Sequence, residues 1–154
     1  VPELSSPATA SEDSLIPYVE AIESKATERL LLLIDDSLSI RKFVGRMLES
    51  AGYVVHTAVD GEEGLRKASA ERYRLIITDL EMPKLNGYEV IQGLRSREHT
   101  QQTPVIVMTT RAGDKHRQMA LNIGASSYIA KPVEERALIQ EIERWIGKEA
   151  AMRQ

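Results

Sequence analysis

Short runs of apolar and β-branched residues recur along the chain, and most of them end at a polar or charged residue. The runs cover residues 30–34, 53–57, 75–79, 105–109 and 127–130. Such runs are typical of strands that are buried on both faces of a sheet. Between the runs, apolar residues return every three or four positions, which is the spacing of helices with one buried face. The pattern predicts strands that alternate with helices between residues 29 and 147.

Polar caps and glycines mark the expected ends of these helices. Ser37 or Asp36 can cap the first helix, and Gly52 follows its last apolar position. Gly124 and Gly147 are expected to end the last two helices. The residues expected on buried helix faces include Ile40, Phe43, Val44, Met47, Leu48, Val90, Ile91, Leu94, Met119, Ala120, Leu138, Ile142 and Trp145.

Alternation of strands and helices at this spacing implies βαβ units and a parallel sheet with helices on both faces. We therefore expect an α/β fold, a (βα)5 doubly wound parallel five-stranded sheet. In the flavodoxin-like strand order 2-1-3-4-5, the first and third strands are neighbours. The carboxyl ends of those two strands then meet at the point where the strand order reverses, which is where open α/β sheets bind ligands.

Three acidic residues follow the first and third strands. Asp35 and Asp36 come directly after residues 30–34, and Asp79 ends the run that starts at Leu75. Carboxylates crowded together repel one another, and a hard divalent cation removes that cost. Mg²⁺ takes oxygen ligands and typically uses one or two carboxylates together with a phosphate. The three acids therefore predict a Mg²⁺-dependent phosphoryl site in which an aspartate can act as the nucleophile.

Two further groups are expected at the same edge of the sheet. Thr109 ends the fourth strand with a hydroxyl, and Lys131 follows the fifth strand with an ammonium. Phosphoryl transfer needs positive charge and hydrogen-bond donors around the phosphoryl oxygens. The histidines His56, His99 and His116 show no metal-ligand spacing, and we interpret them as surface or structural residues.

From about residue 29 to residue 147, the chain resembles the receiver domain of two-component response regulators. The segments that carry the resemblance are LLLIDDS, LIITDLEMPKLNG, VIVMTT and SSYIAKP. The resemblance implies that Asp79 accepts a phosphoryl group from a histidine kinase or a histidine phosphotransfer domain. It also implies that Asp36 binds Mg²⁺ directly, that Asp35 does so mostly through water, and that the main-chain carbonyl of Glu81 completes the metal site.

The resemblance also assigns a switch. Lys131 would contact the phosphoryl oxygens, and Thr109 would move to hydrogen-bond them. Tyr128 occupies the position of the family's rotating aromatic residue, and the bond between Lys131 and Pro132 is expected to be cis. Phosphorylation would then repack the surface formed by the fourth helix, the fifth strand and the fifth helix, where a downstream protein or domain would bind.

Two charged residues flank the expected path of attacking water. Glu81 lies two positions after Asp79, and Arg111 lies two positions after Thr109. Because their charges are opposite, we hypothesise that they pair across the site and tune the lifetime of the phosphoryl group.

Composition and charge add bounds to this picture. The chain has 154 residues, which suits one domain, and it contains no cysteine. The first 28 residues carry six acids and one base, so they form an acidic linker in which a short helix over 16–27 is one interpretation and an extended linker the other. Residues 29–147 are the expected receiver domain, and 148–154 are a tail.

The chain is expected to be cytoplasmic, without membrane contact. Its surplus of only two positive charges outside the linker argues against direct nucleic-acid binding.

Other interpretations remain open on the residues alone. A haloacid-dehalogenase-like phosphatase also uses an aspartate nucleophile and Mg²⁺, although residues 35–38 do not fit that family's motif. A receiver-like scaffold that is never phosphorylated is another. The expected role is a signalling module and not an enzyme, apart from assisting its own phosphorylation and dephosphorylation. The Val start and the acidic lead-in favour a piece of a longer protein, for which the carboxyl-terminal receiver of a hybrid histidine kinase is the expectation.

Overall fold

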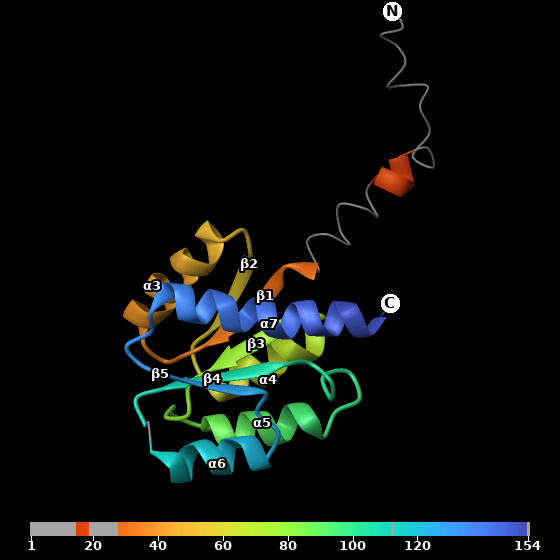
Figure 1. Cartoon of the computed structure of the whole chain (residues 1–154). Helices are drawn as coiled ribbons and strands as arrows, with labels where there is room; N and C mark the ends of the chain where they lie inside the picture. The colour runs from red at the N-terminus through yellow and green to blue at the C-terminus, as the bar shows by residue number, and fades with distance from the viewer. Residues whose placement is uncertain (1–14, 19–27, 112, 154) are drawn as a thin grey trace, which may run out of the picture.

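A five-stranded parallel sheet forms the centre of the computed structural model, which describes residues 15–18, 28–111 and 113–153, with no side chains described beyond 147 (Figure 1). Its strands are β1 (Leu30–Ile34), β2 (Val54–Ala58), β3 (Leu75–Thr78), β4 (Val105–Thr109) and β5 (Ser127–Ala130). Their order is β2-β1-β3-β4-β5, which confirms the order expected from the sequence. The second strand begins and ends one residue later than its apolar pattern suggested.

The pairing register brings the carboxyl ends of the strands to one level. Ile34 at the end of β1 pairs with Ala58 on one side and with Thr78 on the other. Thr109 at the end of β4 pairs with Ala130 of β5. The polar residues that follow these strands therefore emerge along a single edge of the sheet.

Helices cover both faces of the sheet and bury alternate residues of each strand. The helices are α3 (Leu38–Ser50), α4 (Gly61–Ala70), α5 (Gly87–Arg95), α6 (Asp114–Asn122) and α7 (Glu135–Arg153). Leu31 and Leu33 of β1 pack in the cluster that contains residues of α3 and α7. Leu32 and Ile34 pack in the cluster that contains residues of α4, α5 and α6. Because both faces are covered, the three central strands β1, β3 and β4 are buried along their whole length, which is why they read as apolar runs.

Two residues expected on buried helix faces are exposed instead. Phe43 of α3 is 58% exposed and Met119 of α6 is 44% exposed. On α3 the sheet covers Val44, Met47 and Leu48, so residue 43 falls at the rim of the apolar stripe. On α6 only Ala120 is buried, because most of this helix is polar.

The last helix differs from its expected end. Gly147 does not stop α7, which continues to Arg153. Gly52 and Gly124, which follow α3 and α6, have positive φ values of 97° and 119°, and they end their helices as expected. A glycine with helical backbone angles costs a helix only about 1 kcal/mol relative to alanine, so Gly147 by itself is a weak stop signal.

The lead-in before the domain is described only in part. Leu15, Ile16 and Tyr18 lie in a short helical segment and are 52%, 45% and 69% exposed. The rest of the helix expected over 16–27, from residue 19 onward, lies outside the described residues. Among the described residues, no helix combines the length and the apolar character that a membrane crossing needs.

Candidate functional site

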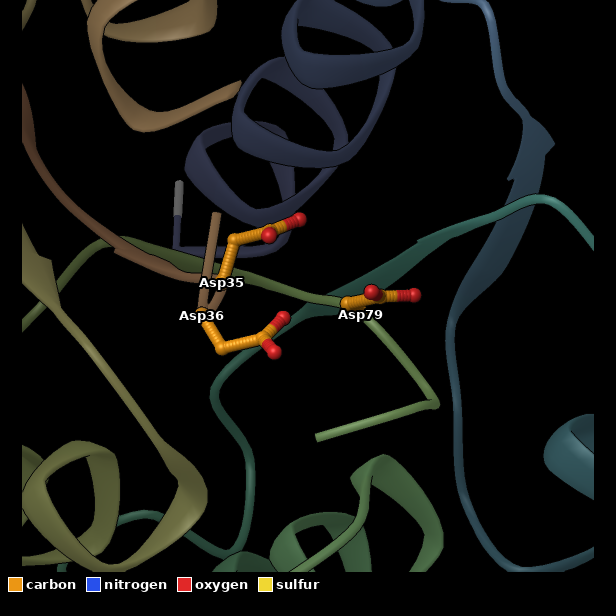
Figure 2. Close-up of side chains that lie close together, drawn as sticks. All are labelled: Asp35, Asp36 and Asp79. Carbon is orange, nitrogen blue, oxygen red and sulfur yellow. The ribbon is translucent and has the colours of Figure 1, made fainter. Parts of the chain in front are cut away.

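Three carboxylates gather where β1 and β3 end side by side. Asp35 and Asp79 are buried, at 0% and 7% exposure, while Asp36 is exposed. Figure 2 shows their side chains projecting in the same general direction from the two strand ends. One oxygen from each of the three lies within 4.8 Å of the others. The backbone fixes this arrangement, because the amide of Asp79 donates to the carbonyl of Ile34 across the two strands at 3.1 Å.

Lys131 forms salt bridges with two of these carboxylates. Its Nζ lies 2.8 Å from Oδ2 of Asp35 and 3.2 Å from Oδ2 of Asp79, and only 11% of its side chain is exposed. Burial lowers the pKa of Lys131, but the two carboxylates more than offset this effect and hold the pKa above its ordinary value. The ammonium is therefore a fixed positive charge at the edge of the sheet. Its place follows from the register, because the amide of Lys131 donates to the carbonyl of Thr109 at 2.8 Å.

The carboxyl group of Asp79 is held in one orientation. The amide of Leu80 donates to its Oδ1 at 2.7 Å, while Oδ2 faces Lys131. Burial raises the pKa of Asp79, Lys131 acts in the opposite direction, and the neighbouring Asp35 raises the pKa further. A carboxylate in this setting gains from any added cation that reduces its repulsion with its neighbours.

Thr109, Arg111 and Tyr128 lie on the neighbouring strands and the loop after β4. The Thr109 side chain is fully buried, and its hydroxyl accepts a hydrogen bond from the amide of Arg111 at 3.2 Å. The Tyr128 hydroxyl of β5 donates to the carbonyl of Arg111. Thr109 is thus at the expected edge, and Tyr128 is tied to the loop that leads from Thr109 to α6.

Glu81 and Arg111 form the ion pair expected from their positions. Nη2 of Arg111 lies 2.6 Å from Oε2 of Glu81, and each side chain is about half exposed, at 49% and 50%. The hydrogen bond from Arg111 holds the pKa of Glu81 below its ordinary value. The pair links the loop after β3 to the loop after β4.

Several contacts that support the site were not predicted from the sequence. The amide of Ser37 donates to Oδ1 of Asp35 at 2.9 Å, and Nη1 of Arg41 donates to the carbonyl of Asp35 at 2.7 Å. A Cβ atom at Gly87 would lie only 2.2 Å from the carbonyl oxygen of Asp79, so α5 begins directly against the end of β3. The Asn-Gly pair at 86–87 signals the helix start, but sequence alone does not show which backbone the glycine touches.

The histidines have the structural contacts expected of them. His56 hydrogen-bonds Tyr73 at 2.7 Å, His116 hydrogen-bonds Tyr88 at 3.2 Å, and His99 contacts the carbonyl of Glu71 at 2.9 Å. The bond between Lys131 and Pro132 is cis, which confirms that expectation.

The donor set fits a hard divalent cation. Asp35, Asp36 and Asp79 offer carboxylate oxygens, and the described part of the chain brings no other group of three or more histidine or acidic ligands together. Oxygen ligands with few protein donors and room for water are what Mg²⁺ selects.

A family model for the response regulator receiver domain matches residues 31–143. The Haemophilus influenzae "Transcriptional regulatory protein CpxR homolog" is 36% identical over 121 residues, which are 79% of this chain and 52% of that protein. The Vibrio cholerae CAI-1 autoinducer sensor kinase/phosphatase CqsS is 31% identical over 126 residues, 81% of this chain and 18% of that protein. This chain thus spans about half of the first relative and less than a fifth of the second.

The fold has matching solved structures. The receiver domain of sensor histidine kinase PA1611 from Pseudomonas aeruginosa, determined with a magnesium ion coordinated in its active-site cleft, superposes with a TM-score of 0.73 and 33% identity. The match covers 77% of this chain and 98% of that domain. Sequence, fold and the acidic edge of the sheet agree, and the chain belongs to the response regulator receiver domain family, the phosphoacceptor signalling module of two-component systems.

Proposed function

We propose that Asp79 is the phosphoacceptor of this receiver, with Lys131 and Thr109 as its partners in the reaction. The observation that carries the proposal is the Lys131 ammonium, 2.8 Å from Asp35 and 3.2 Å from Asp79 at the carboxyl edge of the sheet. A fixed cation beside an oriented, buried carboxylate is the arrangement that stabilises charge on a transferred phosphoryl group.

In the proposed reaction, a carboxylate oxygen of Asp79 attacks the phosphorus of a phosphohistidine on a histidine kinase or a histidine phosphotransfer domain. The N–P bond breaks, its electron pair returns to the imidazole, and the O–P bond of an aspartyl phosphate forms. Asp79 must be ionised to attack, and Lys131 opposes the rise in pKa that burial causes. The buried hydroxyl of Thr109 can turn from its bond with the Arg111 amide to donate to a phosphoryl oxygen.

The metal chemistry is assigned to the acidic cluster. Asp36 and Asp79 would hold Mg²⁺ directly, Asp35 mostly through water, and the main-chain carbonyl of Glu81 would complete the protein ligands. Bound Mg²⁺ supplies neutralisation of the negative charge on the phosphoryl oxygens. The chain's own contribution is to hold the acids within 4.8 Å of one another before any ligand arrives.

Intact-mass measurement tests the assignment. Incubation with a small phosphodonor and Mg²⁺ is expected to add a single phosphoryl group, and the adduct is expected to be absent without Mg²⁺ and in Asp79→Ala. Asp60→Asn is the matched control, because Asp60 is another buried aspartate just beyond a neighbouring strand, where it caps α4. Asp60→Asn is expected to keep the adduct.

The same experiment separates the alternatives. An adduct that persists in Asp79→Ala would move the acceptor to another residue. No adduct under any condition would favour the scaffold, and steady turnover of a generic phosphomonoester would favour a phosphatase.

The proposed output is a switch of the surface formed by α6, β5 and α7. Addition of a phosphoryl group brings charge and hydrogen-bond acceptors to Asp79, which attract the Thr109 hydroxyl. The Tyr128 hydroxyl donates a hydrogen bond to the carbonyl of Arg111. A movement of the loop after β4, which contains Arg111, would therefore change the position of the Tyr128 side chain. A downstream protein or domain would read the altered surface, without direct contact to nucleic acid by this domain.

The ion pair of Glu81 and Arg111 is proposed to tune the phosphoryl lifetime. It joins two loops beside Asp79, so it lies where water would approach an aspartyl phosphate. Arg111→Ala is expected to change the rate of phosphoryl loss, with faster loss if the pair shields the site.

The decay of the phosphorylated protein, followed by intact mass, measures this rate. The pair of Arg66 and Glu63 on α4 supplies a control, because Arg66 is an exposed cation that pairs with a carboxylate at 3.6 Å. Arg66→Ala is expected to leave the rate unchanged. An unchanged rate in Arg111→Ala would rule out the tuning role.

We also propose that this domain is the receiver of a hybrid histidine kinase. The matches to the sensor kinase CqsS and to the receiver of sensor histidine kinase PA1611 support this placement. Phosphotransfer from the kinase domain of the same natural protein, with Asp79→Ala as the acceptor-free control, would test it.

A further inference from the structure

A groove lies between α3 and the start of α7, away from the acidic cluster. Its lining residues from α3 include Lys42, Phe43, Arg46 and Met47, and those from the other wall are Val133 and Glu135. Phe43 is 58% exposed there, and Lys42 and Arg46 are exposed on either side of it. An aromatic ring left open to solvent between two cations suits an occupant that is apolar on one face and acidic on the other.

The chain itself carries a segment with these properties. In the lead-in, Leu15, Ile16, Val19 and Ile22 recur at helical spacing, while Glu20 and Glu23 lie off that face. The first 28 residues hold six acids and one base. Leu15 and Ile16 are 52% and 45% exposed, so their apolar surface is also open to a partner.

We propose that residues 12–23 dock in the groove beside Phe43 as an intramolecular occupant, with their acids against Lys42 and Arg46. The proposal goes beyond phosphoryl transfer and does not depend on it.

The point where the lead-in joins the domain makes this contact reachable. Arg29 is fixed beside the end of α3, because its Nε donates to the carbonyl of Gly52 at 2.7 Å. The groove runs along α3 from Ser50 to Ser39, a distance of about 17 Å at 1.5 Å per helical residue. Six residues lie between Ile22 and Arg29, and the seven residue steps of an extended chain span about 23 Å. The apolar stripe can therefore lie anywhere along the groove, and its tether keeps its effective concentration high.

Acidic residues near the start of α7 determine which wall of the groove residues 12–23 would contact. A hollow next to the groove is lined by Glu134, Glu135 and Glu143, together with Arg136 and Ile139. An acidic segment is repelled there, so the α3 side of the groove, which carries both lysine and arginine, is the favoured position.

Spin labelling tests the contact in the full chain. The protein has no cysteine, so Ser14→Cys gives a single nitroxide site just before the stripe. The label is expected to broaden the backbone amide signals of Ser39, Lys42 and Phe43, which lie at the end of the groove far from Arg29. Lys42→Glu combined with Arg46→Glu is expected to abolish this broadening, as is Leu15→Ser combined with Ile22→Ser.

The control variant places the same charge change on the opposite layer. Lys115→Glu combined with Arg117→Glu alters exposed cations of α6 and is expected to leave the broadening in place. Broadening confined to residues next to Gly52, or broadening that survives Lys42→Glu with Arg46→Glu, would overturn the proposal. A mixture of spin-labelled and unlabelled chains separates contact within one chain from contact between chains, when the amide signals of the unlabelled chain are observed. Equal broadening of those signals would show that a second copy fills the groove, which would also overturn the proposal.

Discussion

The ammonium of Lys131 lies between two buried carboxylates that repel each other. It touches Asp35 and Asp79, and neither acid has much contact with water. The sequence indicated each of these residues through its place after an apolar run, because a parallel sheet brings such positions to one edge. It did not indicate that Lys131 would bridge both acids, since that depends on side-chain directions that no spacing encodes.

Removal of the lysine is expected to destabilise the metal-free protein. Lys131→Ala leaves Asp35 and Asp79 buried and without their cation, which costs about 3 kcal/mol of unfolding free energy. Urea unfolding without Mg²⁺ measures the loss. Lys84→Ala is the control, because Lys84 pairs with Asp60 at 3.5 Å while 60% exposed, and the expected cost is below about 1 kcal/mol. Equal losses for the two variants would contradict the bridging role.

Tyr73 is expected to make the fold sensitive to alkaline pH. Burial raises its pKa to about 12, and its hydroxyl hydrogen-bonds His56 at 2.7 Å. Since the folded pKa lies above the ordinary value of 10.0, the stabilisation is fully present below pH 10.0 and is lost as pH rises toward 12. In Tyr73→Phe, the free energy of unfolding is expected to depend less on pH between 10.0 and 12. The lost hydrogen bond is expected to lower the free energy of unfolding by about 1 kcal/mol at neutral pH. Unfolding curves across the window measure it, and an unchanged slope in Tyr73→Phe would contradict the assignment.

At the scale of the elements, glycines that look alike in the sequence have different roles. Gly52 has a positive φ and ends α3, whereas Gly147 lies within α7. Gly87 begins α5 at close approach to the backbone of Asp79, while Gly45 lies in α3 with nothing near its Cβ position. The sequence predicted helix ends at Gly52 and Gly147 alike, and only the folded structure separates the two. The presence of each helix was predicted from the spacing of its apolar residues. The end of α7 was not predicted, because a helix end depends on contacts in the folded protein.

Substitution of two of these glycines is expected to give opposite results. Gly87→Ala places a Cβ 2.2 Å from the carbonyl oxygen of Asp79 and 2.7 Å from Cα of Leu80, so the backbone at Asp79 must shift. We expect a loss of more than about 2 kcal/mol and impaired phosphorylation. Gly45→Ala meets no atom within 4 Å and is expected to stabilise α3 by up to about 1 kcal/mol. Thermal unfolding of both variants measures the effects, and a neutral Gly87→Ala would show that the close approach is not a constraint.

For α5, the capping box is expected to control stability at the helix start. The side chain of Asn86 accepts from the amide of Glu89, and the Glu89 carboxylate accepts from the amide of Asn86, both at 3.0 Å. Asn86→Ala is expected to cost about 1 kcal/mol, while Asn86→Gly costs only a few tenths, because glycine leaves the amides open to water. Chemical denaturation of the two variants distinguishes a lost cap from a lost side-chain contact, and equal costs would argue against capping.

At the scale of the whole molecule, alternating strands and helices were enough to predict a parallel sheet with helices on both faces. The strand order came from the flavodoxin-like arrangement, and the structure has that order. The pattern determines the fold class because unbroken apolar runs need cover on both faces. The exposed position of Phe43 was not predicted, because the width of the buried stripe on α3 is set by packing and not by the spacing of apolar residues. The roles of Glu81, Arg111 and Tyr128 stay predictions, although the contacts of all three are in place.

The parallel sheet also has a consequence for the order in which the site is assembled. Along the chain, Lys131 follows Asp35 by 96 residues and Asp79 by 52 residues. During synthesis from the amino end, β1 and β3 can pair and bring their acids together well before the lysine has been made. Repulsion between those acids weakens this half-built sheet until β5 adds its cation. Docking of the last strand therefore both completes the sheet and neutralises the site, which favours a late, cooperative closing step in folding.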